Sequence, residues 1–145
     1  MKKRNILILL GPNLNLTGTR EKGIYGEETA ESINRQIISK GNALDLNCTI
    51  FQTNHEGVII DKIHDHKNVY EGGVINAGAL AQYSYAIREA IAAVRIPFIE
   101  VHMTNIYARE EFRRKSVIAD VCAGQIAGFG KNSYFLALQA INELI

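Results

Sequence analysis

The sequence predicts an α/β fold, a three-layer sandwich in which helices cover both faces of a five-stranded parallel sheet. The alternation of two kinds of segment along the chain supports this prediction. Five short apolar runs, rich in β-branched residues, alternate along the chain with longer segments of helical periodicity, and strands that alternate with helices pair in parallel through right-handed crossovers. The chain has 145 residues, of which 47% are hydrophobic; this is the size of one domain, so we expect residues 1–145 to fold as a single domain.

The expected strands are the apolar runs, which cover residues 5–10, 44–53, 73–76, 97–101 and about 117–127. The first expected helix covers 28–41, where Ile33 and Ile37 are four residues apart. The second opens at Thr53 and Glu56, which have the spacing of a capping box. Three further helices are expected, namely one with an apolar stripe (Tyr83, Ala86, Ile87, Ala90, Ile91 and Val94), a short exposed one (107–115) and a last one (with Tyr134, Phe135, Leu138 and Ile141).

Charge and hydropathy exclude several classes of partner. Sixteen basic and fifteen acidic side chains leave a net charge of +1 without a long block of either sign, so we expect no nucleic acid and no membrane surface as partner. No apolar run approaches the roughly twenty residues of a membrane span, and we expect a soluble, cytoplasmic protein. Cys48 and Cys122 have neither redox nor zinc spacing, so we interpret both as buried structural thiols.

The residues that follow each strand are the candidates for chemistry, because open parallel sheets bind ligands at the carboxyl ends of their strands. Residues 11–26 follow the first strand and include Asn13, Arg20 and Tyr25. A plain surface loop is one interpretation, but so long a connection is unusual unless it is functional, and we interpret it as a lid. It matches neither the phosphate-loop nor the dinucleotide-binding pattern, which argues against a nucleotide cofactor.

Polar residues also follow the third strand and end the fourth. Asn76, small residues and Gln82 follow the third, where they form either an anion site at a helix N-terminus or a tight turn. Glu100 and His102 are two residues apart in the fourth strand and therefore face the same side of the sheet. A carboxylate beside an imidazole orients the ring and favours its protonated form, as a general acid requires, although a buried structural ion pair has the same spacing.

The remaining charged segments are interpreted as solvent-exposed. The cluster at 109–115 is expected to be a solvated helix face, with one inward-pointing arginine as the possible exception. His64 and His66 are interpreted as solvated residues at a helix end, so we expect no metal site.

Five segments of the chain resemble the type II dehydroquinases. In chain order they read GPNLNLTGTREKGIYG, FQTNHEGVIIDKIH, INAGALAQYSYAIREAI, IEVHMTNIYAREEFRRKS and GQIAGFGKNSYFLAL. The resemblance implies a flavodoxin-like fold and a homo-oligomer, a dodecamer built from four trimers. It also implies a lyase without cofactor or metal, which dehydrates 3-dehydroquinate to 3-dehydroshikimate by anti elimination through an enolate, in the shikimate pathway or in quinate breakdown.

The resemblance assigns a catalytic role to each residue that matches a motif of the family. Tyr25 corresponds to the catalytic base, His102 to the general acid and Glu100 to the partner of that histidine. Arg20 corresponds to the transition-state stabiliser, and Asn13 to the residue that holds a water against the enolate. A guanidinium in a water-poor site favours a phenolate, so Arg20 is also expected to activate Tyr25.

The substrate-binding positions of the family correspond here to Asn76, Gln82, Glu89, Met103, Thr104 and Arg113, with the backbone amides of 103–104 taking the substrate carboxylate. Gln82 stands where the family usually has His; it keeps a neutral donor and acceptor but cannot become charged. Glu89 stands where the family usually has an Asp that reaches into the neighbouring subunit's site. Gln82 therefore leaves a non-catalytic or altered-substrate relative as the alternative hypothesis. A flavodoxin-like electron carrier is a third, disfavoured because the first loop lacks a Ser/Thr-rich phosphate cradle.

Overall fold

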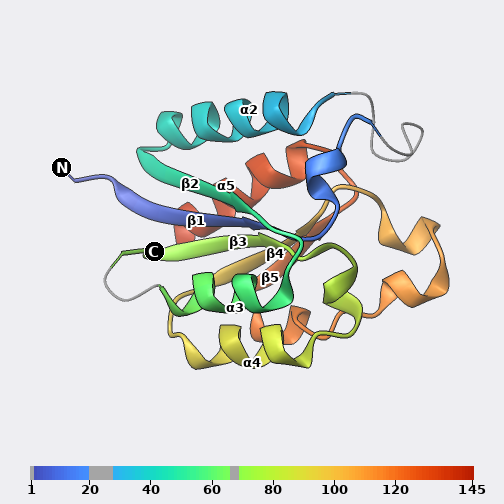
Figure 1. Cartoon of the computed structure of the whole chain (residues 1–145). Helices are drawn as coiled ribbons and strands as arrows, with labels where there is room; N and C mark the ends of the chain where they lie inside the picture. Colours follow the sequence, from blue (N-terminus) through green and yellow to red (C-terminus); the bar gives the residue numbers. More distant parts are fainter. Residues whose placement is uncertain (1, 20–27, 66–68) are drawn as a thin grey trace.

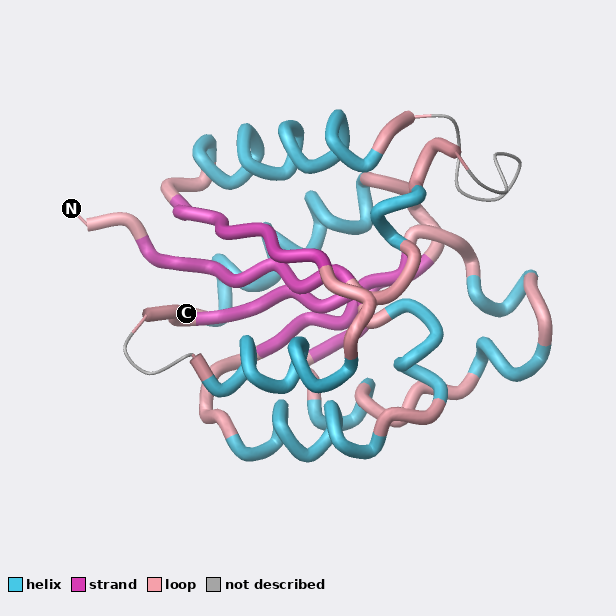
Figure 2. The backbone as a smooth tube through the Cα atoms, in the orientation of Figure 1, coloured by secondary structure: helices cyan, strands magenta, loops and turns pink. Residues whose placement is uncertain are grey.

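The computed structural model describes residues 2–19, 28–65 and 69–145. At its centre lies a five-stranded sheet in the order β2-β1-β3-β4-β5, in which every neighbouring pair is parallel (Figure 1, Figure 2). The strands are β1 (Arg4–Leu10), β2 (Leu46–Gln52), β3 (Gly72–Asn76), β4 (Phe98–His102) and β5 (Gly124–Ala127). This strand order is flavodoxin-like, so the predicted α/β class and the fold implied by the resemblance are both confirmed.

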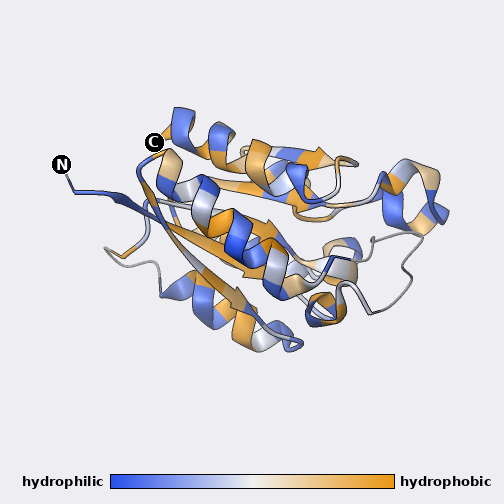
Figure 3. Cartoon of the chain, turned by 90° about the horizontal axis from the view of Figure 1, so that it is seen from above, coloured by the Kyte–Doolittle hydropathy of each residue, from blue (hydrophilic) through white to orange (hydrophobic). Residues whose placement is uncertain are grey.

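Helices cover both faces of this sheet. On one face lie α2 (Ala30–Ala43) and α5 (Asn132–Leu144), and on the other lie α3 (Glu56–His64) and α4 (Tyr85–Ala93) (Figure 1). The strands are mostly hydrophobic and the helices are mixed, as expected of helices with one buried face (Figure 3). Side chains of β1 alternate between the two faces, because successive residues of a strand point to opposite sides. Those that pack with α2 and α5 are Ile6, Ile8 and Leu10, and those that pack with α3 and α4 are Leu7 and Leu9.

The apolar stripe of α4 is shorter than predicted. The residues of the stripe that are buried are Ile87, Ala90, Ile91 and Val94. Ala86 is exposed, and Tyr83 precedes the helix and is 62% exposed. The hydroxyl oxygen of Ser84 accepts a hydrogen bond from the Ile87 amide (3.1 Å). Ser84 is therefore the N-cap, and the helix begins after it.

The start of α3 differs from the predicted capping box. The Thr53 amide donates to the Leu10 carbonyl (3.0 Å), which extends the β1–β2 pairing past Gln52. Thr53 therefore stays extended, and its hydroxyl accepts from the His55 amide (3.1 Å). His55 takes the N-cap position, and Glu56 does not reach back but accepts from the Ser84 hydroxyl. The predicted cap at Thr53 was wrong because pairing with β1 holds that residue in the sheet.

The predicted fifth strand was too long at its N-terminal end. Pairing with β4 begins only where the Ala123 amide donates to the Phe98 carbonyl (2.8 Å). Before that point Val117 and Ile118 are buried against α3 and α4, and a 3₁₀ turn, η5 (Ala119–Val121), follows them. The apolar residues before Ala123 therefore belong to a core segment that is not a strand.

The charged segment after β4 forms two short 3₁₀ turns, η3 (Ile106–Ala108) and η4 (Glu111–Arg114), and not one helix. They project from the body of the molecule beside the carboxyl ends of the strands (Figure 1, Figure 2). This position brings the segment to the edge of the sheet where ligands are expected.

Both cysteines are partly buried free thiols. Burial raises the pKa of the Cys48 thiol to about 11 and that of Cys122 to about 12. Neither thiol is therefore ionised near neutral pH, in agreement with a structural role. In the described ranges, no helix combines the length and hydropathy that crossing a membrane requires.

Candidate active site

A polar cavity of about 180 Å³ lies where the carboxyl ends of β1, β3 and β4 meet. The chain continues from β1 to β2 on one side and from β3 to β4 on the other, so the two connections run in opposite directions from this point. The predicted site residues that line the cavity are Asn13, Asn76, Gln82, His102, Met103, Thr104 and Arg113. The structure thus brings together side chains from three strand ends, as the sequence predicted.

A close approach of the loops after β1 and β3 places Asn13 and Asn76 on the same cavity. A Cβ atom on Gly11 would lie 2.5 Å from the Ala77 carbonyl oxygen, closer than non-bonded atoms can approach. Only glycine therefore fits there. The Gly11 amide donates to the Asn76 carbonyl (2.8 Å) and joins the β1 and β3 loops. Gly78 has a φ of +59°, a conformation open to glycine, and continues the β3 loop into η2 (Gly78–Gln82).

Asn13 adopts the left-handed conformation, with a φ of +69°. Asn tolerates this region better than most residues, and non-glycine residues there are often functional. The Asn13 amide donates to Asn54 Oδ1 (3.0 Å), and the same oxygen accepts from Gln52 Nε2 (3.1 Å). Sequence reasoning missed Asn54, although its place directly after β2 is a signal that could have found it.

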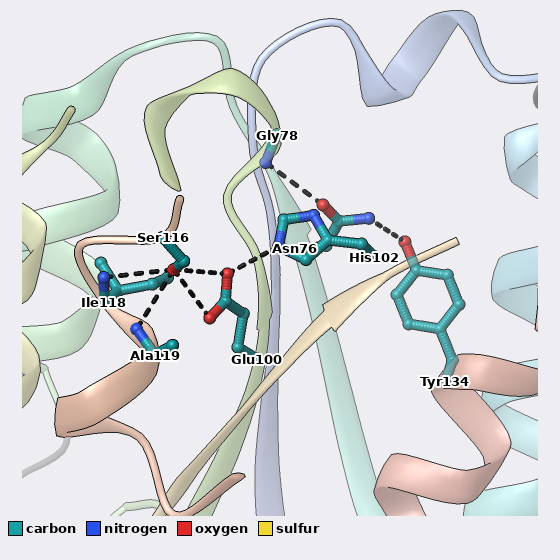
Figure 4. A network of polar contacts seen from close by, with 8 residues as sticks. All are labelled: Asn76, Gly78, Glu100, His102, Ser116, Ile118, Ala119 and Tyr134. Carbon is teal, nitrogen blue, oxygen red and sulfur yellow. Dashed lines mark hydrogen bonds and ion pairs between the residues drawn. The ribbon is translucent and has the colours of Figure 1, made fainter. Parts of the chain in front are cut away.

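Glu100 and His102 form a buried pair. Glu100 is 0% exposed and His102 is 7% exposed, and His102 Nε2 lies 2.6 Å from Glu100 Oε2. The Ser116 hydroxyl contacts both oxygens of the same carboxylate (Figure 4). An ionised carboxylate only accepts, so the Nε2 proton points to Glu100 and Nδ1 is the ring nitrogen left to meet a ligand. This arrangement can hold and deliver one proton.

Asn76 is oriented from behind the cavity. Its Nδ2 donates to the Tyr134 hydroxyl (2.8 Å), and its Oδ1 accepts from the Gly78 amide (3.2 Å) (Figure 4). Burial raises the pKa of Tyr134 to about 12, so its side chain remains a neutral phenol. The sequence predicted Tyr134 as a core residue of α5, and nothing in its helical spacing indicated this contact with β3.

Gln82 and two arginines supply the other polar groups of the cavity. Gln82 Oε1 is buried and has no hydrogen-bond partner among the described residues, so it is an acceptor that a ligand hydroxyl can satisfy. The side chains of Arg109 and Arg113 are 11% and 22% exposed and line the same wall. Arg113 pairs with Glu110, and this contact lowers the pKa of Glu110.

Arg109 was expected to be on a solvated face, and that expectation was wrong. Its Nη1 donates to Thr104 Oγ1 (3.4 Å), which draws the side chain over the cavity. The cause is the break of the segment into two 3₁₀ turns, which directs both Arg109 and Arg113 inward where a continuous exposed helix was predicted. Two guanidinium groups on one wall suit an anionic ligand.

A family model described as dehydroquinase class II matches residues 4–142. The chain belongs to the class II dehydroquinases. It is 56% identical to a 3-dehydroquinate dehydratase of Caldicellulosiruptor saccharolyticus, over 100% of this chain and 99% of the relative. Among solved structures, it resembles the type II dehydroquinase of Butyrivibrio crossotus with a TM-score of 0.95 and 46% identity, over 98% and 99% of the two chains. The enzyme of Propionibacterium acnes gives a TM-score of 0.92 and 39% identity, over 97% of each chain.

The other predicted site residues of this dehydroquinase-family chain are not part of the cavity wall that the structure describes; Glu100 lies behind His102. Arg20 and Tyr25 lie outside the described residues. Glu89 is exposed on α4, away from the cavity of its own chain, so its predicted role at a neighbouring subunit stays a prediction. Within 2–19, 28–65 and 69–145, no group of three or more His, Cys, Asp or Glu side chains is arranged to hold a metal ion.

Proposed function

We propose that the protein is a 3-dehydroquinate dehydratase that removes water from 3-dehydroquinate to give 3-dehydroshikimate. Membership of the class II dehydroquinases and the full-length similarity to proteins of that name support the reaction. The observation that carries the proposal is the buried Glu100–His102 pair at the wall of a polar cavity. A dehydration of this kind needs an acid that protonates the departing hydroxyl, and this pair is suited to that step.

The proposed reaction begins with the removal of a proton next to the ketone. Tyr25, as phenolate, accepts this proton, and the electrons of the broken C–H bond form the enolate. Arg20 favours the phenolate, and a water held by Asn13 stabilises the enolate oxygen. The enolate then collapses, the C–O bond to the β-hydroxyl breaks, and the new carbon–carbon double bond forms.

His102 provides the proton that turns the departing hydroxyl into water. Its Nε2–H donates to Glu100 throughout, and the proton on Nδ1 is transferred to the leaving oxygen. The imidazolium formed before this step is stabilised by the Glu100 carboxylate at 2.6 Å. His102 then takes a proton from solvent and Tyr25 releases the proton it accepted, so that both residues return to their starting states.

The cavity offers a matching group for each polar part of the substrate. We assign the substrate carboxylate to the Met103 and Thr104 amides, with Arg113 nearby as a countercharge. Asn76 and the side-chain oxygen of Gln82, which has no partner in the described part of the chain, are assigned to the ring hydroxyls. We also infer a dodecamer of four trimers, in which Glu89 completes the site of a neighbouring subunit.

The direct test is to add 3-dehydroquinate to the protein and to follow the enone absorbance of the product in the ultraviolet. We expect turnover by the unmodified protein, and loss of at least 10²-fold in kcat for His102→Ala, a value typical of the removal of a general acid. Tight ligand binding without turnover would establish the non-catalytic alternative that Gln82 raises. Turnover by His102→Ala at the unmodified rate would refute the assignment of the acid.

A further inference from the structure

Ser116 is a polar residue that the mechanism has not yet used. Its Oγ lies 2.9 Å from Glu100 Oε1 and 2.8 Å from Oε2. Glu100 is fully buried, and a buried carboxylate stays ionised only where donors solvate it. Together with the His102 ring, the Ser116 hydroxyl provides that solvation (Figure 4).

The direction of the Ser116 hydrogen bond is set by its other partners. Its Oγ accepts from the amides of Ile118 (3.3 Å) and Ala119 (3.1 Å). A hydroxyl oxygen has two acceptor sites, so both are used, and its single proton remains for Glu100. The two amides also polarise the hydroxyl and strengthen it as a donor. Ser116 can therefore donate to the carboxylate but is poorly placed to accept a proton from it.

The backbone around Ser116 is held from outside the site. The Val117 amide donates to the Ala81 carbonyl (2.8 Å), and Arg88 Nη1 donates to the Val117 carbonyl (2.9 Å). Arg88 also pairs with Asp120, three residues further on. These bonds to η2 and α4 fix the position of the hydroxyl before any substrate arrives.

We propose that Ser116 is a positioning residue of the general-acid pair. Its hydroxyl holds the Glu100 carboxylate turned toward His102 Nε2, and the imidazole is thereby held with Nδ1 toward the cavity. Because the role concerns the acid step, the inference rests on the proposed dehydration. Ser116 is not among the residues that line the cavity, so it acts through Glu100 and not on the substrate.

A matched pair of serines distinguishes this role from a purely structural one. Ser84 donates to one oxygen of the Glu56 carboxylate and accepts from the Ile87 amide, which is a similar pattern with no histidine bonded to the carboxylate among the described residues. Ser116→Ala is expected to lower kcat about 10- to 100-fold, the usual cost of losing a hydrogen bond to a charged group at such a site, with KM changed less than about twofold. Ser84→Ala is expected to lower the melting temperature while kcat stays within about twofold.

Two further variants keep the test decisive. Ser116→Thr retains the hydroxyl and is expected to restore most of kcat. If Ser116→Ala does not fold, Ser116→Cys replaces it, because a thiol fills the same space but is a weak donor; its kcat should also fall. Unchanged kcat in folded Ser116→Ala or Ser116→Cys overturns the proposal, and so does an equal loss of kcat in Ser84→Ala.

A spectroscopic measurement separates this inference from the proposed function. The ¹⁵N NMR shifts of His102 report which ring nitrogen carries the proton, without any turnover. At a pH where the ring is neutral, we expect only the Nε2–H tautomer in the unmodified protein and a mixture of the two tautomers in Ser116→Ala. The same single form in both proteins would overturn the role of Ser116, whereas an unmodified protein that fails to dehydrate 3-dehydroquinate would overturn only the proposed function.

Discussion

Replacing Glu100 with Gln tests the proposed general-acid pair most directly, because the change removes a charge at nearly constant size. Glu100 accepts from His102 Nε2 at 2.6 Å and from the Ser116 hydroxyl at 2.8 and 2.9 Å. A Gln amide accepts at one end only. Its NH₂ group must face either the ring nitrogen or a serine oxygen that already accepts from two backbone amides. Each orientation therefore leaves one mismatched contact in a buried site.

The size of the effect follows from these contacts. Loss of a charge-assisted hydrogen bond costs about 1.5–3 kcal/mol, and a buried mismatched donor costs about 1–3 kcal/mol. If about 3–4 kcal/mol of this total is expressed in the transition state, kcat falls by about 10²- to 10³-fold, at about 1.4 kcal/mol for each factor of ten. KM should change far less, because Glu100 lies behind His102 and does not line the cavity.

The assay is initial-rate kinetics with 3-dehydroquinate, read from the enone absorbance. Glu56→Gln is the matched control, since the Glu56 carboxylate also accepts from a serine hydroxyl but forms no hydrogen bond with a histidine in the described residues. We expect its kcat to stay within about twofold of the unmodified protein. A folded Glu100→Gln protein with kcat within threefold of the unmodified value would refute the assignment of Glu100 and His102 as a catalytic pair.

Three further predictions concern the supports of the site. Gly11→Ala should destabilise the protein by about 2–4 kcal/mol in urea unfolding, because the new Cβ would lie 2.5 Å from a backbone oxygen that cannot move cheaply; a change below about 0.5 kcal/mol would contradict the close approach. Tyr134→Phe removes the acceptor of the Asn76 amide and should raise KM about 3- to 10-fold in steady-state kinetics; an unchanged KM would contradict this role. The hydrogen bond from Lys131 is the main cause that lowers the pKa of Glu28 to about 2 from 4.5. The stability that this bond contributes is complete above about pH 4.5 and is lost as the pH falls toward 2. The melting temperature should therefore drop less between pH 5 and pH 2.5 in Lys131→Met than in the unmodified protein, and equal drops would contradict the coupling.

The sequence by itself determined the α/β class, the parallel sheet and the strand ends that carry the site. These features depend on the local order of apolar and polar side chains, which is visible in periodicity. The same local reasoning failed at Thr53 and at residues 117–123, where pairing with β1 and burial against α4 decide the outcome. Both errors concern element ends, where partners distant in sequence compete with local preference.

Only the tertiary structure decided how the proposed catalytic side chains are supported. Ser116 reaches Glu100 across 16 residues, Asn54 reaches Asn13 across 41, and Tyr134 reaches Asn76 across 58. No spacing rule links such pairs, because their contacts arise only when loops and helices pack on the finished sheet. The residues that are proposed to perform the chemistry lie in sequence motifs, so the sequence alone can identify them. The residues that orient them can be identified only from their contacts in the folded structure.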